Sequence, residues 1–325
     1  MKLSILIAAY NVEQYIHKCI TSCYNETLSS HYEIIVVNDG STDQTLDILE
    51  NMSSVSNLKI INKQNEGLGA ARNTAIVHAG GEYIWMLDGD DFIESSQLGV
   101  LIHELESNKH DVYCMNYNIT DQDGVPSSTK YPMDKKTAVF EATTYYQKFK
   151  SNSYTWQYIF KRSIFLNNQL FYLPSINMQD SEILPRIIYY STSVKYLDIV
   201  GYNYVQHSQS FTNSKDFSKR LRYFESIITV NQSLETSKKK VLATNSKLAI
   251  AIEDQQKALH QIVFSHIVYF QYTKENLKIV LKLLNENRFY PFVCNVSGKL
   301  KLVRFGLNNF PVLTKKFIEL VKPSL

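Results

Sequence analysis

The chain has 325 residues, of which 44% are hydrophobic and 20% are charged, and its formal net charge is +3. This composition is typical of a globular protein with a core large enough to need no disulfides, and it excludes a disordered, fibrous or collagen-like chain. No apolar run approaches the roughly 20 residues of a membrane-spanning helix, and the four cysteines form no CxxC pair. We therefore expect a cytoplasmic protein with reduced cysteines.

Short apolar runs alternate with helical patterns over residues 1–118. Strands are predicted at 3–9, 33–37, 58–62, 83–87 and 112–117, and helices at 12–24, 42–52, 68–78 and 96–108. Most of the strands are nearly continuous in Ile, Val and Leu, as expected when both faces of a parallel sheet are covered. Asn11 and Ser41 are predicted to cap the first two helices. The alternation predicts an α/β fold with a mostly parallel central sheet flanked by helices.

The remainder of the chain divides into a mixed segment and a helical one. Residues 119–132 are polar and contain Asp, Gly, Ser and Pro, which predicts a loop. Residues 137–215 mix strand and helix patterns, and the pattern of 216–287 is helical. We therefore predict one domain over 1–215, followed by a helical C-terminal extension over 216–325.

The tail at 299–322 is basic and amphipathic. From Val296 to the C-terminus there are six Lys or Arg side chains and one acid, Glu319, so the tail carries +5 and the rest of the chain −2. Nucleic acid would need a basic face on a folded domain, so we predict no nucleic acid partner. A basic amphipathic segment is typical of contact with an anionic membrane surface. The alternative is a last helix that packs on the domain and leaves its basic face in water.

Polar residues follow four of the predicted strands. They are Tyr10-Asn11-Val12-Glu13, the run from Asn38 to Asp43, the run from Asn65 to Asn73, and Asp88-Gly89-Asp90-Asp91. In a parallel sheet, ligands bind outside the carboxyl ends of the strands. The four segments are therefore expected to form one site that is rich in carboxylates and contains one arginine, Arg72.

The aspartates of the last segment suggest a metal ion. Crowded carboxylates repel one another unless a cation lies among them, and hard oxygen ligands favour Mg²⁺ or Mn²⁺. A metal held by few protein ligands suits a diphosphate leaving group, and Arg72 could add a bidentate phosphate contact. Taken alone, Asp-Gly-Asp-Asp is also a turn with a helix cap. The four segments together are more specific.

Several stretches resemble a known family. SILIAAYNVEQYI, EIIVVNDGSTDQT and NEGLGAARNTAIVHAGGEYIWMLDGDD strongly resemble the family 2 glycosyltransferases, which have the glycosyltransferase-A fold. TWQYIFKRSIF, MQDSEIL and YNYVQHSQSFTN resemble the rest of that catalytic domain less closely. The resemblance spans about the first two thirds of the chain.

The resemblance implies an activity and partners. Residues 1–215 would be the catalytic domain, with a nucleotide-binding half at 1–118 and an acceptor-side half at 119–215. The enzyme would move a hexose or N-acetylhexosamine from a UDP-sugar to a glycan acceptor, usually with inversion and with Mn²⁺ or Mg²⁺. We expect it to act in the synthesis of a bacterial capsule, O-antigen or exopolysaccharide. If the tail contacts membrane, the enzyme would lie at the inner face of the plasma membrane and its acceptor would be lipid-linked.

The resemblance also implies roles for single residues. Those that match nucleotide-binding positions are Tyr10, Glu13, Asp39, Arg72 and Asp88. Asp88 and Asp90 match the Asp-x-Asp motif, whose second aspartate usually binds the metal. Further candidates at the site are Asp91 and Asn65.

Asp180 matches the catalytic base, which takes the proton of the acceptor hydroxyl. Gln179 precedes it where the family usually has Glu, and Glu182 is a nearby alternative. Ala8 and Asn38 also stand where Pro and Asp are common. We favour Asp180 because it directly precedes a helical pattern, where the motif belongs.

Two further side chains have two interpretations each. Trp156 could stack on an acceptor sugar or pack inside the domain. His207 could contact the metal or the diphosphate, or it could be a surface or hydrogen-bonded histidine.

Other classes of protein would show other signals. A nucleotidyltransferase usually has a Gly-rich, Arg-containing loop after the first strand, and the chain has no Gly there. A dinucleotide-dependent oxidoreductase would use Gly67-Leu68-Gly69, but that loop follows the third strand and has Arg72 at the third glycine position. The main alternative is a non-catalytic carbohydrate- or nucleotide-binding protein on the same fold, against which the intact aspartates argue.

Overall fold

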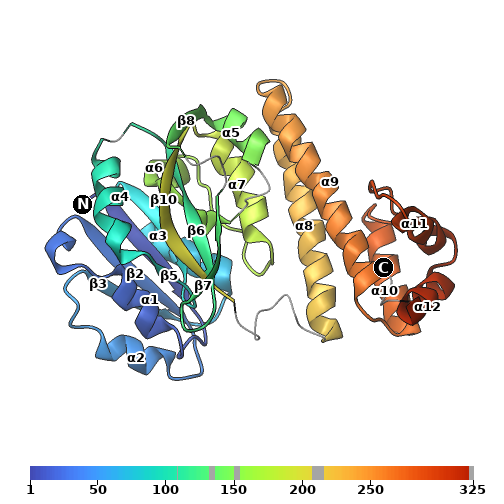
Figure 1. Cartoon of the computed structure of the whole chain (residues 1–325), viewed down its shortest axis with the longest axis horizontal. Helices are drawn as coiled ribbons and strands as arrows, with labels where there is room; N and C mark the ends of the chain where they lie inside the picture. The colour runs from blue at the N-terminus through green and yellow to red at the C-terminus, as the bar shows by residue number, and fades with distance from the viewer. Residues whose placement is uncertain (108, 132–135, 150–153, 207–215, 322–325) are drawn as a thin grey trace. The chain divides into compact units, whose positions relative to one another are not determined.

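The computed structural model describes residues 1–107, 109–131, 136–149, 154–206 and 216–321, without the side chains of 317 and 319–321. The chain forms two compact units, Met1–Asn213 and Ser214–Leu325. In Figure 1 the first unit runs from blue through green to yellow, and the second runs from pale orange to red.

Among the described residues, ten strands of the first unit form one mixed sheet. They are β1 (Leu3–Ala9), β2 (Tyr32–Asp39), β3 (Leu58–Lys63), β4 (Tyr83–Asp88), β5 (Phe92–Ile93), β6 (Val112–Thr120), β7 (Pro126–Lys130), β8 (Ala138–Glu141), β9 (Tyr158–Lys161) and β10 (Ser193–Val205). The order is β3-β2-β1-β4-β9-β6-β10-β5, with β7 on β6 and β8 on β10. The first four strands pair in parallel, whereas β9 is antiparallel to both β4 and β6 and makes the sheet mixed.

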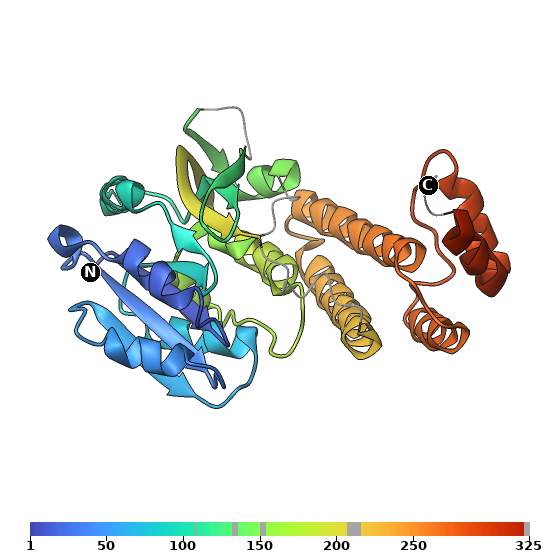
Figure 2. The same ribbon diagram turned by 60° about the horizontal axis from the view of Figure 1, so that its bottom comes forward.

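Helices cover both faces of this sheet (Figures 1 and 2). They are α1 (Ile16–Cys23), α2 (Thr45–Asn51), α3 (Leu68–His78), α4 (Leu98–Glu106), α5 (Ala142–Phe149), α6 (Arg162–Asn167) and α7 (Gln179–Tyr189). Leu3, Ile5 and Ile7 of β1 pack in one core with apolar residues of α1, α2 and α4. The alternate residue Leu6 is buried on the opposite face, and α3 packs on β1 and β2. Double-sided burial explains the continuous apolar runs of the first strands.

The first two helices begin later than predicted, at Ile16 and Thr45, and the predicted caps are wrong. Asn11 has φ +53°, and its side chain accepts the backbone N–H of Thr42 at 2.8 Å. The hydroxyl of Ser41 in turn accepts the N–H of Asn11 at 3.0 Å. The polar side chains that the pattern assigned to helix caps therefore join the loops after β1 and β2.

The segment 119–132, which was predicted to be a loop, contains the end of β6 and the strand β7. Val125 donates its N–H to the Asp121 carboxylate at 2.8 Å, and Gly124 has φ +89°, so a tight turn leads from β6 into β7. β7 is an exposed edge strand that is held by backbone pairing, and it therefore lacks the apolar pattern of a buried strand.

The second unit is helical, in agreement with the predicted extension. Its helices are α8 (Phe217–Val241), α9 (Ser246–Tyr269), α10 (Lys274–Glu286), α11 (Leu300–Asn309) and α12 (Pro311–Val321). Asp216, Asn245 and Thr273 cap α8, α9 and α10 with their side chains. The long helices α8 and α9 lie side by side in both views (Figures 1 and 2). In the part of the chain that the structure describes, no helix has the length and apolar character needed to cross a membrane.

Candidate functional site

The carboxyl ends of four parallel strands meet at one edge of the sheet. In the register of β1 with its neighbours, Ala9 lies opposite Asn38 of β2, and Ala8 lies opposite Asp88 of β4. The end of β3 follows, because its last residue pairs with Asp39. The polar segments that leave these strands therefore start side by side, as expected for a ligand site.

Arg72, on α3, is the centre of this edge. Its side chain is only 3% exposed, and it donates to Asp88 at 2.7 Å and to Asp180 at 3.0 Å. Burial disfavours the charge of the guanidinium, but the carboxylates of Asp88 and Asp180 outweigh that effect and raise the pKa of Arg72. The ring of Tyr172 lies 5.2 Å from the guanidinium carbon. Arg72 thus fixes the end of β4 against the start of α7.

Asp180 lies in the first turn of α7, after Met178 in the left-handed conformation with φ +58°. Its side chain is 21% exposed, and it accepts the Thr155 hydroxyl at 2.6 Å in addition to Arg72. Burial raises the pKa of Asp180, and Arg72 and Thr155 offset part of that shift. A carboxylate with a raised pKa and open surface suits a proton acceptor.

Glu182 and Gln179, on the same helix as Asp180, are more deeply buried than Asp180. Glu182 is 1% exposed and pairs with Arg186 at 2.9 Å, so its carboxylate is enclosed within the fold. Gln179 is also buried; it accepts from Arg72 at 3.5 Å and donates to the carbonyl of Ile176 at 3.0 Å. A glutamate at this position could not donate to that carbonyl and would place a third carboxylate beside Arg72.

Asp88, the last residue of β4, and the two aspartates that follow it have different surroundings. Asp91 is buried and accepts the Tyr202 hydroxyl at 2.6 Å and the Val205 N–H at 2.7 Å, so it holds β10. Burial raises the pKa of Asp91, and the charges of Asp90 and Asp88 raise it further. Within the described ranges no group of three or more His, Cys, Asp or Glu side chains forms a complete metal cage. Asp88, which pairs with Arg72, and Asp90 suit a cation that is held by one or two carboxylates together with a bound diphosphate.

The loops after β1 and β2 are fastened to each other. Glu13 accepts the backbone N–H of Gln44 at 2.8 Å. Tyr10, one residue past the end of β1, is half exposed at the same edge. Of these two predicted nucleotide-binding residues, Tyr10 has a side chain that is accessible to a ligand. Glu13 also fixes the loop after β2 through its bond to Gln44.

Asp39 fastens the loop after β3. It is buried, and its carboxylate accepts the N–H groups of Glu66 at 3.1 Å and Gly67 at 2.7 Å. Asn65 is exposed on this loop. Gly40 has φ +71°, and a Cβ added to it would lie only 2.7 Å from the backbone nitrogen of Asn65. Position 40 therefore requires glycine.

Trp156 is 2% exposed and lies between other aromatic rings, so the interpretation that it stacks on a sugar is wrong. Its ring is stacked on Tyr202 with centroids 4.3 Å apart and on Tyr154 with centroids 4.8 Å apart. Tyr154, which no sequence pattern indicated as a site residue, is 44% exposed. His207 lies outside the described residues.

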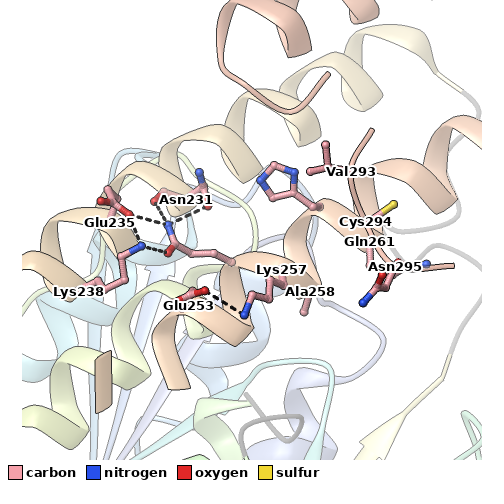
Figure 3. Close-up of a pocket in the computed structure, with 12 residues that line it drawn as sticks. Asn231, Glu235, Lys238, Glu253, Lys257, Ala258, Gln261, Val293, Cys294 and Asn295 are labelled. Atoms are coloured by element: carbon pink, nitrogen blue, oxygen red, sulfur yellow. Dashed lines mark hydrogen bonds and ion pairs between the residues drawn. The ribbon is translucent and has the colours of Figure 1, made fainter. Parts of the chain in front are cut away.

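The second unit contains a cavity of about 630 Å³, and several of the side chains that line it are polar (Figure 3). Its polar side chains contact one another: Gln256 accepts from Lys238 at 3.1 Å and donates to Asn231 at 3.2 Å, and Lys238 pairs with Glu235 at 2.7 Å. These polar side chains thus bind one another, and none of the predicted site residues lines this cavity.

Comparison with known proteins adds independent information. A sequence model described as glycosyl transferase family 2 matches residues 4–170. EpsJ of Bacillus subtilis (strain 168), called an uncharacterized glycosyltransferase, is 31% identical over 216 residues, which cover 65% of this chain and 62% of EpsJ. Chondroitin synthase of Escherichia coli is 29% identical over 239 residues, which cover 71% of this chain and 32% of that protein. The matches thus span less than two thirds of the length of these relatives.

A solved structure shares the fold. The crystal structure of S. aureus TarS 1–349 in complex with UDP-GlcNAc superposes with a TM-score of 0.68 at 18% identity, over 99% of this chain and 92% of that chain. The predicted glycosyltransferase-A-like class with C-terminal helices is therefore confirmed. Because the family match covers half of the chain, the protein belongs to glycosyl transferase family 2, and the predicted family is confirmed.

Proposed function

We propose that the protein is a glycosyltransferase of bacterial polysaccharide synthesis that moves a hexose or N-acetylhexosamine from a UDP-sugar to a glycan acceptor. The observation that carries this proposal is the buried Arg72, which joins Asp88 of the Asp-x-Asp segment to Asp180. One guanidinium thereby links the place expected for the donor to the group expected to activate the acceptor. Relatives named as chondroitin synthase and as a poly(ribitol-phosphate) glucosyltransferase support a polymer as acceptor.

In this proposal Asp180 is the base. It takes the proton of an acceptor hydroxyl while that oxygen forms a bond to the anomeric carbon of the donor, and the bond from this carbon to the diphosphate breaks. A single displacement inverts the anomeric configuration. Arg72 and Thr155 orient the Asp180 carboxylate, and the ion pair with Arg72 opposes the effect of burial on the pKa of Asp180.

The donor would lie across the edge of the sheet. Tyr10, Glu13 and Asp39 would contact the nucleobase and ribose from the loops after β1 and β2, and Asp88 would contact the ribose. Asp90, with Asp88 beside it, would hold Mn²⁺ or Mg²⁺. The ion would neutralise negative charge on the diphosphate as UDP leaves. The assignment of catalysis to 1–215 and of a separate extension to 216–325 belongs to this proposal.

The proposal is tested by thermal unfolding with UDP, GDP or CMP, each with and without Mn²⁺. A ligand that binds only the folded protein raises its stability. We expect UDP to stabilise the wild type only with Mn²⁺, and Asp90→Ala to remove that effect. Glu50→Ala, an exposed carboxylate on α2, is the matched control and should respond like the wild type. If no nucleotide stabilises the wild type under any metal condition, the proposed donor site is wrong.

The tail would bring the enzyme to an anionic membrane surface. On α11, Leu302 is 76% exposed and Phe305 is 65% exposed, and Lys301 is exposed on the same helix. Two other basic residues of the tail instead contact the protein: Arg304 donates to the carbonyl of Cys294, and Lys315 donates to that of Val268. Exposed apolar side chains next to exposed lysine are complementary to a surface with acidic lipid headgroups.

Vesicle pelleting tests this contact. The double variant Leu302→Ser, Phe305→Ser should pellet less with phosphatidylglycerol vesicles than the wild type. Leu242→Ser, which changes an exposed leucine at the end of α8, should not. Equal pelleting of all three proteins, or equal binding to neutral phosphatidylcholine, would contradict an anionic membrane contact.

A further inference from the structure

An irregular segment, residues 168–178, joins α6 to α7 and leads directly to Asp180. The structure describes this segment over its whole length, and it contains neither helix nor strand. Three of its residues, Gln169, Ser175 and Met178, have φ between +51° and +58°, a conformation that residues other than glycine rarely adopt. The local sequence therefore does not favour this path, and contacts with other elements must hold the segment in place.

Asn73 of α3 binds the middle of this segment with both ends of its side-chain amide. Its Nδ2 donates to the carbonyl of Tyr172 at 2.9 Å, and its Oδ1 accepts the backbone N–H of the same residue at 2.8 Å. Tyr172 is 1% exposed, so water does not readily replace these two bonds. One side chain of α3 thus supplies the backbone pairing that a neighbouring strand would supply in a sheet.

Two further contacts hold the residues on either side. Arg186 of α7 donates to the carbonyl of Phe171 at 2.6 Å. On α3, a Cβ added to Gly69 would lie 2.7 Å from the carbonyl oxygen of Leu173, so the backbones of the helix and the segment are in close contact. Residues 171–173 are therefore held between α3 and α7, the helix that carries the proposed base.

The same segment packs against Arg72. The ring of Tyr172 lies 5.2 Å from the guanidinium carbon of Arg72, which donates to Asp180 at 3.0 Å. Asn73 is the next residue along α3, so one helix supplies both the cation that pairs with Asp180 and the amide that fixes the chain leading to it. A displaced Tyr172 would therefore loosen the packing of Arg72 as well as the start of α7.

We propose that Asn73 is a positioning residue for the transfer reaction: it holds the backbone of Tyr172 and thereby keeps the Asp180 carboxylate where it can meet the acceptor hydroxyl. This inference rests on the proposed function, because Asp180 is the base only in that proposal. A displacement of about 1 Å can cost roughly 10²-fold in rate, because proton transfer requires hydrogen-bond distance. Asn is a poorer helix former than Ala or Leu, so helix propensity does not explain this residue inside α3.

Asn73→Leu and Asn73→Ala test the inference. Leucine keeps the size of the side chain and removes both hydrogen bonds, and neither replacement weakens α3, because Leu and Ala favour helix more than Asn does. The matched control is Asn308→Leu in the second unit. Asn308 accepts the N–H of Phe292 at 2.8 Å and donates to its carbonyl at 3.0 Å, so the control loses the same pair of bonds in the other unit.

Two measurements are made on each variant. Hydrogen–deuterium exchange at the Tyr172 amide reports whether the segment is held. Steady-state rates of UDP release are measured with Mn²⁺ and with UDP-glucose, UDP-galactose and their N-acetylamino forms as donors, and with p-nitrophenyl glycosides of the same sugars as acceptors. Each Asn73 variant is also combined with Asp180→Asn, because residues that act through one group have non-additive effects.

We expect the Tyr172 amide to exchange roughly 10-fold faster in both Asn73 variants, as expected when one buried hydrogen bond is lost. The kcat should fall roughly 10- to 100-fold, while the KM for the UDP-sugar and the stabilisation by UDP with Mn²⁺ stay unchanged. In the Asp180→Asn background the same replacements should change kcat by no more than about 2-fold, because the base is already lost. Asn308→Leu should leave kcat and the exchange of Tyr172 at their wild-type values.

Three results would overturn the inference and leave the proposed function standing. They are wild-type exchange at Tyr172 in the Asn73 variants, an equal fall in kcat with and without the Asp180 carboxylate, and a fall in kcat no larger than that of Asn308→Leu. The last two would indicate a general loss of stability. If UDP with Mn²⁺ does not stabilise the wild type, or if no combination of donor and acceptor gives turnover, the proposed function fails and the inference fails with it.

Discussion

Replacing Arg72 by methionine tests the charge arrangement at the centre of the site. Methionine keeps most of the length of the side chain but leaves Asp88 and Asp180 without their shared cation. Removing one partner of a buried ion pair typically costs about 3–5 kcal/mol. Because Asp88 and Asp180 are 27% and 21% exposed, water compensates in part, and we expect about 2–4 kcal/mol. For a unit of this size, about 3 kcal/mol lowers the Tm by roughly 9 °C.

The pH dependence identifies the cause of this loss. Arg72 lowers the pKa of Asp180 relative to the effect of burial alone, so its removal should raise that pKa further. When the pH falls from about 8 to about 4, through the raised pKa of Asp180, that carboxyl becomes protonated and no longer needs a cation. The difference in Tm between wild type and Arg72→Met should therefore shrink at low pH. Lys148→Met, an exposed position on α5, should show no difference at either pH. A difference that stays constant with pH would show that lost packing, and not charge, explains the effect.

Further predictions concern single carboxylates. Asp180→Asn should lower kcat by about 10²–10⁴-fold while stabilisation by UDP persists. Glu182→Gln should instead lower the Tm and leave kcat at saturating substrates nearly unchanged. Steady-state rates and thermal unfolding distinguish the two variants. Because burial raises the pKa of Asp180, the acid limb of the wild-type kcat/KM profile should lie above the roughly 3.9 of a free aspartate, with activity lost as the pH falls through the raised pKa. Asp39→Ala should speed amide hydrogen exchange at Glu66 and Gly67, which donate to its carboxylate, and it should also weaken stabilisation by UDP.

Strands β1, β2 and β4 were predictable because of their burial. Ile5, Leu6 and Ile7 point to alternate faces of β1, and all three are buried, so the strand is continuously apolar in the sequence. The antiparallel strand β9 and the edge strand β7 were not predicted as such. Their positions depend on pairing partners that are distant in the chain, such as Tyr83 opposite Lys161, and no local pattern encodes such a pairing.

The site residues that directly follow strands were predictable from the sequence. Those that reach the site only through tertiary contacts were not. Asp88 and Arg72 belong to segments that follow adjacent strands, and the parallel topology brings them together. Asp180 was reached through the resemblance, since 108 positions separate it from Arg72 and no spacing rule joins the two. Trp156 had two interpretations in the sequence, because an aromatic ring can stack on a sugar or pack in a core. The structure shows that it is 2% exposed and packed against other rings.

Gln179 stands where the family usually has Glu, and a neutral side chain at this position is consistent with the charges around it. Arg72 is the one cation shared by Asp88 and Asp180, and Gln179 lies within 3.5 Å of the same guanidinium nitrogen that binds Asp180. A glutamate there would add a third negative charge beside the position proposed for a diphosphate, and its repulsion would raise the pKa of Asp180 further. The amide instead donates to the carbonyl of Ile176, which holds the turn before α7. Gln179 therefore leaves Asp180 as the open carboxylate at the start of this helix, and the proposed role of Asp180 as the base does not require an acidic residue at position 179.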